Sequence, residues 1–238
     1  MTRKARRQKP GVRAFAEISC FRRRFPSTYK AMQQFLTFMV ALGLLALGSG
    51  CGGRPRIAGL SESSVVLAFG DSLTAGEGAS ATENYPAVLA KLLGCRVVNA
   101  GVSGEMSSEG LLRLPAVLRQ EKVSLVILCE GGNDMLQKQA DDTISKNLDA
   151  MVARVRESGT DAILIGVPKP GFFNLKAPLF YQQIASKNGI LCDSETLPEI
   201  LSKSSLKSDY VHPNAEGYRK MAGAIADLIQ TNQRDLPK

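Results

Sequence analysis

His212 is the single histidine of the 238-residue chain, and it lies in the segment SDYVHPNAEGY near the C-terminus. An imidazole is the side chain best suited to take up and release a proton near neutral pH. Asp209 precedes it by three residues, and its carboxylate is expected to accept the second ring N–H and fix the tautomer. A lone histidine is by default an ordinary residue, so a catalytic interpretation requires a group for it to activate.

Ser72 is the hydroxyl that such a base could activate, because it lies two residues past the apolar run VVLAFG. Gly104 in NAGVSGEMS and Asn133 in EGGNDM follow two later apolar runs. A backbone amide and a carboxamide stabilise a carbonyl oxygen as it becomes negatively charged. These residue types therefore predict an acyl-transfer site. Asp71 and Asp134 flank this site and are interpreted as structural residues that bond loop amides.

Five short aliphatic and β-branched runs predict the strands that position these groups. Their nearly continuous apolar character predicts burial on both faces of a sheet. The runs are 65–70, 95–101, 123–132, 162–167 and 189–192. Helical patterns between them predict an α/β protein, a three-layer α/β/α sandwich around a parallel sheet. Ligands of such sheets bind beyond the carboxyl ends of the strands, so the candidate residues should meet at one edge.

Three helices are predicted where apolar residues recur on one face, at 85–93, 144–155 and 218–229. Asn214 is the expected N-cap of the last of them. The segment 107–120 is also helix-like, but Pro115 should kink it or lie in its first turn.

Four blocks, FGDSLTAG, NAGVSG, GGND and DYVHPNAEGY, resemble in type and order those of the GDSL esterases, also called SGNH hydrolases. More narrowly, they resemble the bacterial multifunctional esterases that act as thioesterase, lysophospholipase and arylesterase. The resemblance covers nearly all of the chain after its N-terminal region and implies a flavodoxin-like sheet of five parallel strands. It implies a triad of Ser72, His212 and Asp209, and an oxyanion hole formed by Ser72, Gly104 and Asn133.

Two other functions stay open at this point. Carbohydrate deacetylases share these blocks, and a lipid-anchored binding protein could keep the fold and lose catalysis. The intact candidate residues argue against the binding protein. Phe172, Phe173 and Phe180, in the segment PKPGFFNLKAPLFYQQ, favour an apolar acyl pocket over a sugar platform, with a place in the core as the alternative. The predicted substrate is a small-molecule or lipid ester, and no cofactor motif or metal-binding spacing occurs in the sequence.

The net charge of +8 comes from the N-terminal region. The first 50 residues contain ten Lys and Arg but one acid, which leaves 20 basic and 21 acidic residues in the remainder. A polyanion-binding domain would carry its basic excess in its folded body. The charge distribution therefore argues against nucleic acid as a partner.

The N-terminal region has the order of a secretory signal. A basic stretch precedes the 13-residue apolar run FLTFMVALGLLAL, and small residues then lead to Cys51. LGSGC resembles the lipobox of bacterial lipoproteins, which implies lipidation of Cys51 and a membrane-anchored, periplasmic protein. Plain secretion and an uncleaved anchor are the alternatives, and Met32 is an alternative start of the chain.

The predicted organisation is a signal region at 1–50, a tether at 51–64, a hydrolase domain at 65–232 and a tail at 233–238. Cys95, Cys129 and Cys192 lack the close spacing of a metal or redox site and are expected to be small buried thiols. The sequence leaves the oligomeric state open.

Overall fold

The computed structural model describes residues 54–171 and 175–234. The predicted signal region, Cys51, Phe172 and Phe173 lie outside these residues, so the interpretations placed on them stay predictions. Within the described ranges, no helix is both long and apolar enough to cross a membrane.

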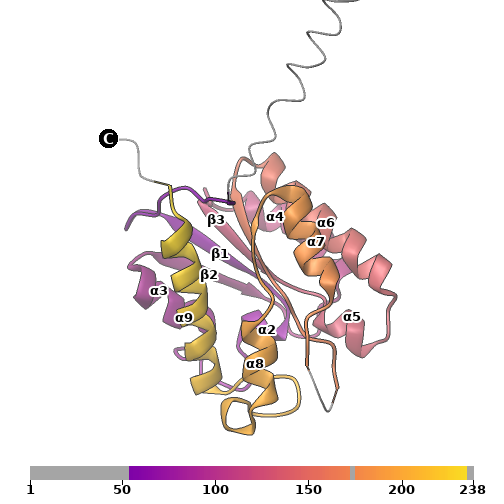
Figure 1. Cartoon of the computed structure of the whole chain (residues 1–238). Coiled ribbons are helices and arrows are strands. Elements are labelled where there is room, and N and C mark those ends of the chain that lie inside the picture. The colour runs from indigo at the N-terminus through magenta and orange to yellow at the C-terminus, as the bar shows by residue number, and fades with distance from the viewer. Residues whose placement is uncertain (1–53, 172–174, 235–238) are drawn as a thin grey trace, which may run out of the picture. The chain divides into compact units, whose positions relative to one another are not determined.

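Five parallel strands form one sheet, as predicted (Figure 1). Their order is β2-β1-β3-β4-β5, which is the flavodoxin-like order with a switch point between β1 and β3. Gly70 at the end of β1 pairs with Gly101 of β2 and with Cys129 of β3, so the carboxyl ends of these three strands lie side by side at one edge of the sheet. The bounds are β1 Val65–Gly70, β2 Arg96–Gly101, β3 Leu125–Cys129, β4 Asp161–Ile165 and β5 Leu191–Asp193.

The central strands β1, β3 and β4 are buried almost throughout, in agreement with their continuous apolar sequence. The expectation of burial on both faces is wrong for β2, in which Arg96 and Asn99 are exposed. The reason is that β2 is an edge strand with a single neighbour in the sheet.

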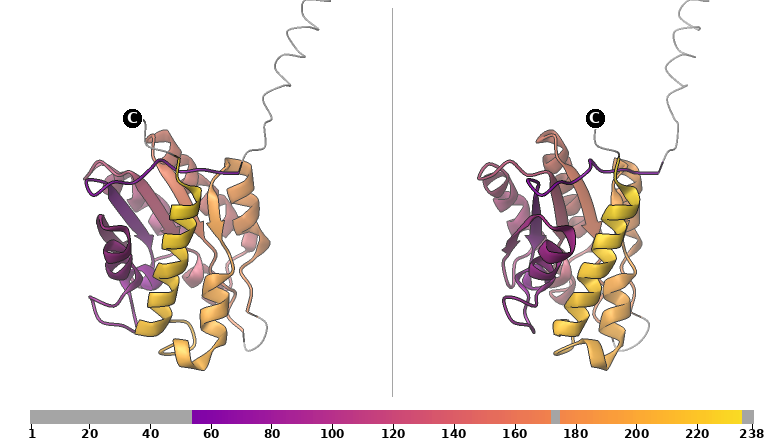
Figure 2. Two further views of the ribbon diagram at one scale, coloured as in Figure 1. Left: turned by 60° about the vertical axis from the view of Figure 1, so that its left-hand side comes forward. Right: turned by 90° about the vertical axis from the view of Figure 1, so that its left-hand side faces the viewer.

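Helices cover both faces of the sheet, which gives the predicted three layers (Figure 2). One layer contains α3 (Tyr85–Leu93), α8 (Thr196–Ser202) and α9 (Ala215–Asn232), in which α9 packs against both others. The other layer contains α4 (Ser107–Leu118), α6 (Asp141–Glu157) and α7 (Leu179–Asn188), in which α6 packs against both others.

The ends of the predicted helices follow from local sequence. Asn214 caps α9 as expected, because its side chain accepts a hydrogen bond from Gly217 N at 3.0 Å. Asn84 caps α3 in the same way, and Gly94 ends that helix in the left-handed conformation. Pro115 lies in the last turn of α4 and not in its first turn.

Two short helices begin at the carboxyl edge of the sheet, and no apolar periodicity in the sequence predicts them. They are α2 (Ser72–Ala75), directly after β1, and α5 (Gly132–Leu136), after β3. Each is too short to show a helical repeat of apolar residues.

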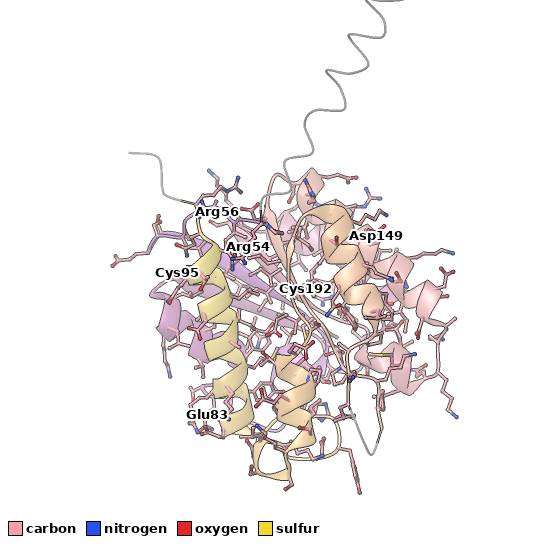
Figure 3. All side chains as sticks on the ribbon, viewed as in Figure 1. Arg54, Arg56, Glu83, Cys95, Asp149 and Cys192 are labelled. Atoms are coloured by element: carbon pink, nitrogen blue, oxygen red, sulfur yellow. The ribbon has the colours of Figure 1, made fainter. Side chains whose placement is uncertain are left out.

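The described part of the predicted tether, residues 54–64, packs on the domain through Ile57. Ile57 is buried, its N–H donates to Asn232 O at 3.0 Å, and its carbonyl accepts from Arg234 N at 2.8 Å. Arg54 and Arg56 precede it in sequence and lie near the end of α9 (Figure 3). An isoleucine in a Gly- and Ser-containing stretch gains enough from burial to dock this segment.

The three cysteines of the described chain are free thiols, and the predicted burial holds for Cys95 and Cys129. Cys95 and Cys129 are buried and Cys192 is half-buried; Cys95 and Cys192 lie well apart in Figure 3. Burial raises the pKa of Cys192 to about 12, so this thiol stays protonated at neutral pH.

Candidate active site

Ser72 leaves the sheet at the end of β1 and is the first residue of α2. Asp71 precedes it as the N-cap, and its Oδ1 accepts from Leu73 N at 3.0 Å. Gly70 is required here because an added Cβ would lie 2.2 Å from Cys129 O. The tight turn therefore presents the Ser72 hydroxyl at the carboxyl edge of the sheet.

His212 lies between Ser72 and Asp209 and contacts both. Its Nε2 is 2.9 Å from Ser72 Oγ, and its Nδ1 is 2.8 Å from Asp209 Oδ2. Asp209 Oδ1 also accepts from the N–H groups of Val211 and His212, both at 2.8 Å. The structure thus brings together three residues that are separated by up to 140 positions in the sequence.

The carboxylate of Asp209 remains ionised in this arrangement. Partial burial alone would raise its pKa, but the hydrogen bonds from the His212 ring and from the Val211 and His212 amides outweigh burial and lower the pKa. An ionised carboxylate on Nδ1 holds the proton on that nitrogen, which leaves Nε2 able to accept the proton of Ser72.

Gly104 lies in the loop after β2 and has a φ of +82°. Nothing lies within 4 Å of the place that a Cβ would occupy here, so the left-handed backbone rather than lack of space favours glycine. A side chain at this position would strain the backbone of the loop.

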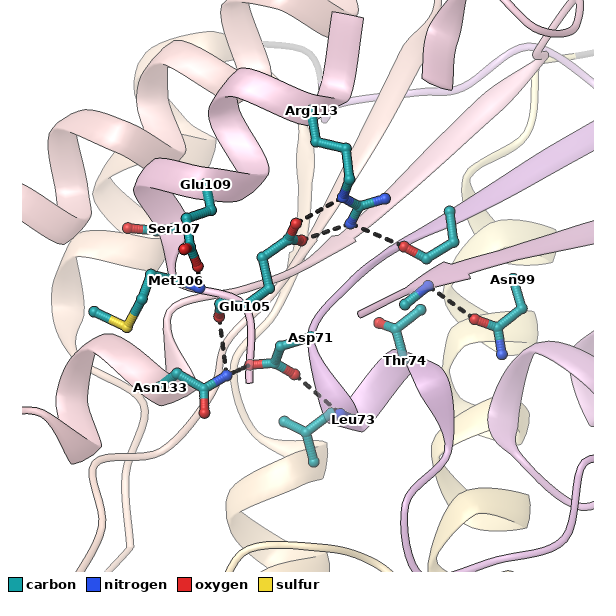
Figure 4. A network of polar contacts seen from close by, with 12 residues as sticks. Asp71, Leu73, Thr74, Asn99, Glu105, Met106, Ser107, Glu109, Arg113 and Asn133 are labelled. Carbon is teal, nitrogen blue, oxygen red and sulfur yellow. Dashed lines mark hydrogen bonds and ion pairs between the residues drawn. The ribbon is translucent and has the colours of Figure 1, made fainter. Parts of the chain in front are cut away.

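Asn133 lies in the first turn of α5, after a left-handed Gly131 with a φ of +101°. Its Nδ2 donates to Glu105 O at 2.9 Å. Its distance to Asp71 Oδ2 is 3.5 Å, at the outer limit of a hydrogen bond (Figure 4). One amide hydrogen is therefore firmly held, and the other has a weak partner.

All five candidate residues line one cavity of about 1340 Å³. Its wall also contains apolar side chains from several elements, namely Leu73, Leu136, Val167, Pro198, Leu201 and Val211. Lys169, Lys176 and Lys207 lie on the same wall. The cavity can therefore hold an apolar group next to the Ser72 hydroxyl, with polar groups around it.

Phe180 is not part of this wall, which corrects the sequence-based interpretation. It lies on α7, is 7% exposed and contacts the Tyr181 ring, with a ring-centroid distance of 4.6 Å and an interplanar angle of 32°. The helical repeat of α7 directs this ring into the hydrophobic core, the alternative that the sequence left open.

A group of buried acids behind Asn133 is a feature that the sequence analysis did not predict. Asp71, Glu105, Glu130 and Asp134 are each less than a tenth exposed. Asp134 accepts from Ser107 N at 2.8 Å and Asp71 from Leu73 N, so both have the structural role predicted for them. Both carboxyl oxygens of Glu130, in contrast, lack a hydrogen-bond partner among the described residues.

Burial raises the pKa of two of these acids. Desolvation, together with the charges of Glu105 and Asp134, raises the pKa of Asp71 to about 7, against the bond from Leu73 and the nearby imidazole. Desolvation and the charges of Asp71 and Glu105 raise the pKa of Glu130 well above its usual range. Burial at this position therefore favours the protonated, neutral form of Glu130.

Glu130→Gln should make the protein more stable than wild type at alkaline pH and change its stability little in acid. The raised pKa means that the folded protein keeps a proton which the unfolded chain releases above about pH 4.3. The stability contribution of the neutral acid is fully present below that unfolded value and is lost as pH rises through the folded value. Glutamine has the same shape and no proton to lose.

The measurement is the melting temperature of both proteins across this pH range, where 1 kcal/mol corresponds to about 2–4 °C. A difference between the two proteins that stays constant with pH would show that the Glu130 carboxyl is not held neutral by burial.

A model of the GDSL-like Lipase/Acylhydrolase family matches residues 68–220, a range that contains all five candidate residues. The chain is 36% identical over 127 residues to Esterase TesA of Pseudomonas aeruginosa, which covers 51% of this chain and 63% of that relative. It is 30% identical to Thioesterase 1/protease 1/lysophospholipase L1 of Escherichia coli, which covers 69% of this chain and 83% of that relative. The aligned part thus spans less than two thirds of the Pseudomonas esterase and most of the Escherichia coli enzyme.

Solved structures show the same fold. A crystal structure of TesA superposes with a TM-score of 0.62 at 26% identity, covering 71% of this chain and 99% of that one. The structure of AlinE4, described as an SGNH-hydrolase family esterase, superposes with a TM-score of 0.56 at 28% identity, covering 74% of this chain and 100% of that one.

Proposed function

The chain belongs to the GDSL-like lipase/acylhydrolase family, and we propose on this basis that it hydrolyses carboxylic ester or thioester bonds with Ser72 as nucleophile. The observation that carries the proposal is the continuous set of contacts from Asp209 through His212 to Ser72, at 2.8 and 2.9 Å. Acyl transfer by a serine requires a base within hydrogen-bond reach of the nucleophile, and a carboxylate within hydrogen-bond reach of that base.

The reaction begins when Ser72 Oγ attacks the acyl carbonyl and its proton moves to His212 Nε2. Asp209 stabilises the imidazolium that forms. The intermediate collapses as His212 gives the proton to the leaving alcohol or thiol, which leaves an acyl group on Ser72. A water molecule then attacks this acyl group with His212 again acting as base, and release of the carboxylic acid restores the hydroxyl.

The negative oxygen of each tetrahedral intermediate is stabilised by three donors in this proposal. They are the backbone amides of Ser72 and Gly104 and the weakly held Nδ2 hydrogen of Asn133. Loss of one such donor typically lowers kcat by about 10²–10³-fold.

The substrate class proposed is an acyl lipid or a small acyl or aryl ester. The apolar side chains that line the cavity, among them Leu73 and Val211, support this class because an acyl chain could be buried against them near Ser72. The printed names of the relatives, which include a thioesterase/lysophospholipase and an arylesterase, point the same way. The alternatives are a carbohydrate deacetylase and a catalytically silent binding protein.

Hydrolysis of p-nitrophenyl esters from acetate to palmitate, beside an acetylated sugar, tests the substrate class. We expect kcat/KM to rise as the acyl chain first lengthens from acetate, because each buried CH₂ contributes about 0.8 kcal/mol of binding. The acetylated sugar should be the poorest substrate. A preference for the acetylated sugar over every aryl ester would favour the deacetylase, and absence of turnover on the whole series would favour the silent protein.

A further inference from the structure

Glu105, which takes no part in the proposed reaction, connects the two oxyanion donors that follow β2 and β3. It comes directly after Gly104, and its main-chain carbonyl accepts from Asn133 Nδ2 at 2.9 Å. Its N–H donates to Val102 O at 3.1 Å, which closes the turn that contains Gly104. One residue thus borders the first donor and orients the second.

The side chain of Glu105 is fixed by Arg113 in the second turn of α4. Arg113 Nε donates to Glu105 Oε1 at 2.6 Å, and Nη2 donates to Oε2 at 2.5 Å (Figure 4). The Glu105 side chain is 5% exposed and that of Arg113 is 25% exposed. A two-pronged contact of this kind defines orientation as well as distance.

Arg113 is itself held by the sheet. Its Nη2 also donates to Ala100 O in β2 at 3.0 Å, and its guanidinium lies 4.0 Å from the ring centroid of Phe69 in β1. The planar guanidinium of Arg113 therefore connects the Gly104 loop, through Glu105, to both β1 and β2.

Close packing of α4 supports the same contact. Gly110 lies between two acids, since an added Cβ would be 3.0 Å from Glu130 Oε1 and 3.3 Å from Glu105 Oε2. Arg113 provides positive charge beside the buried Glu105 carboxylate, which would be costly to leave unpaired in this place. The pair thus compensates for a buried charge as well as fixing the loop.

We propose that Glu105 and Arg113 are positioning residues that hold the Gly104 amide and the Asn133 carboxamide in the geometry required by the transition state. The proposal rests on the proposed function of Ser72, Gly104 and Asn133. The pair acts through these donors and does not contact the substrate.

Glu105→Gln should lower kcat about 10- to 100-fold and leave KM within about twofold, because misplaced donors weaken transition-state binding more than substrate binding. Arg113→Lys keeps the charge but loses the two-pronged contact, so it should lower kcat in the same way. The second variant keeps the test valid if the first folds poorly, and the melting temperature of each variant is measured alongside.

Glu121 offers a matched control. It makes a two-pronged ion pair with Arg96, in which Nη2 donates to Oε1 at 2.6 Å, and Arg96 is the first residue of β2, at the opposite end of that strand from Ala100. Glu121→Gln should therefore leave both kcat and KM unchanged.

A double-mutant cycle with Asn133→Ala identifies the route of the effect. If Glu105 acts through Asn133, Glu105→Gln should lower kcat less in the Asn133→Ala background than in wild type. Equal effects in both backgrounds would overturn the positioning of Asn133 by Glu105, and a Glu105→Gln variant with the kcat of Glu121→Gln would overturn the positioning role as a whole. Ser72→Ala distinguishes the two proposals, since activity that survives in that variant refutes the proposed function itself.

Discussion

Replacing Ser72 by alanine should lower kcat for ester hydrolysis at least about a thousandfold, because it removes the hydroxyl that His212 Nε2 contacts and would activate. The folded structure should be little affected. Ser72 is only partly buried, and the change removes a single hydroxyl whose hydrogen bond goes to His212. We expect the free energy of unfolding to change by about 0.5–1.5 kcal/mol at most.

Steady-state kinetics on a p-nitrophenyl ester and a thermal melt of the same sample measure the two effects together. Turnover within tenfold of wild type would remove Ser72 as the nucleophile. Lost turnover in a variant that also unfolds at a much lower temperature would leave the loss attributable to structure, so Ser72→Gly serves as a second variant that lacks a nucleophile.

His212→Gln should have an effect of similar size and should also change the pH profile. In the wild type, kcat/KM should fall on the acid side, because only the neutral ring can take the proton of Ser72. Glutamine keeps a polar side chain between Ser72 and Asp209 but cannot act as a base. The residual activity of the variant should therefore lack the acid limb.

Asp71 makes the kinetic profile alone ambiguous, because its pKa of about 7 also places a titration near neutrality. The single imidazole of the chain resolves this point, since its resonance in an NMR titration is assigned without further variants. The midpoint of this resonance should coincide with the acid limb of kcat/KM in the free enzyme. An acid limb that survives in His212→Gln, or that follows a different midpoint, would assign control of the rate to another group such as Asp71.

The parts of this fold that depend on local sequence were predictable. Continuous apolar runs identified all five strands, and Asn214 marked the start of α9, because burial and capping act over a few residues. The candidate site was predictable for a related reason. In a parallel sheet, residues that follow strand ends meet at one edge, so Ser72 and Asn133 could be placed together without knowledge of side-chain geometry.

The parts that depend on distant contacts were not predictable. The docking of Ile57 depends on the end of α9, which is distant in the sequence. The inward direction of Phe180 was not predictable because apolar residues recur only weakly on one face of α7. Glu105 and Arg113 are eight residues apart, one in a loop and the other in a helix, so their spacing in the sequence does not predict their contact. Glu130 did carry a signal, since it is a charged residue inside the apolar run 123–132.

Covalent labelling by a fluorophosphonate tests the central claim most directly, because this reagent modifies serine hydroxyls that a neighbouring base has activated. The account predicts one adduct per chain, located by mass spectrometry on the peptide that contains Ser72. Ser72→Ala should give no adduct, and His212→Gln should label far more slowly. An adduct on a different serine, or undiminished labelling of Ser72→Ala, would contradict the assignment of Ser72 as the activated nucleophile.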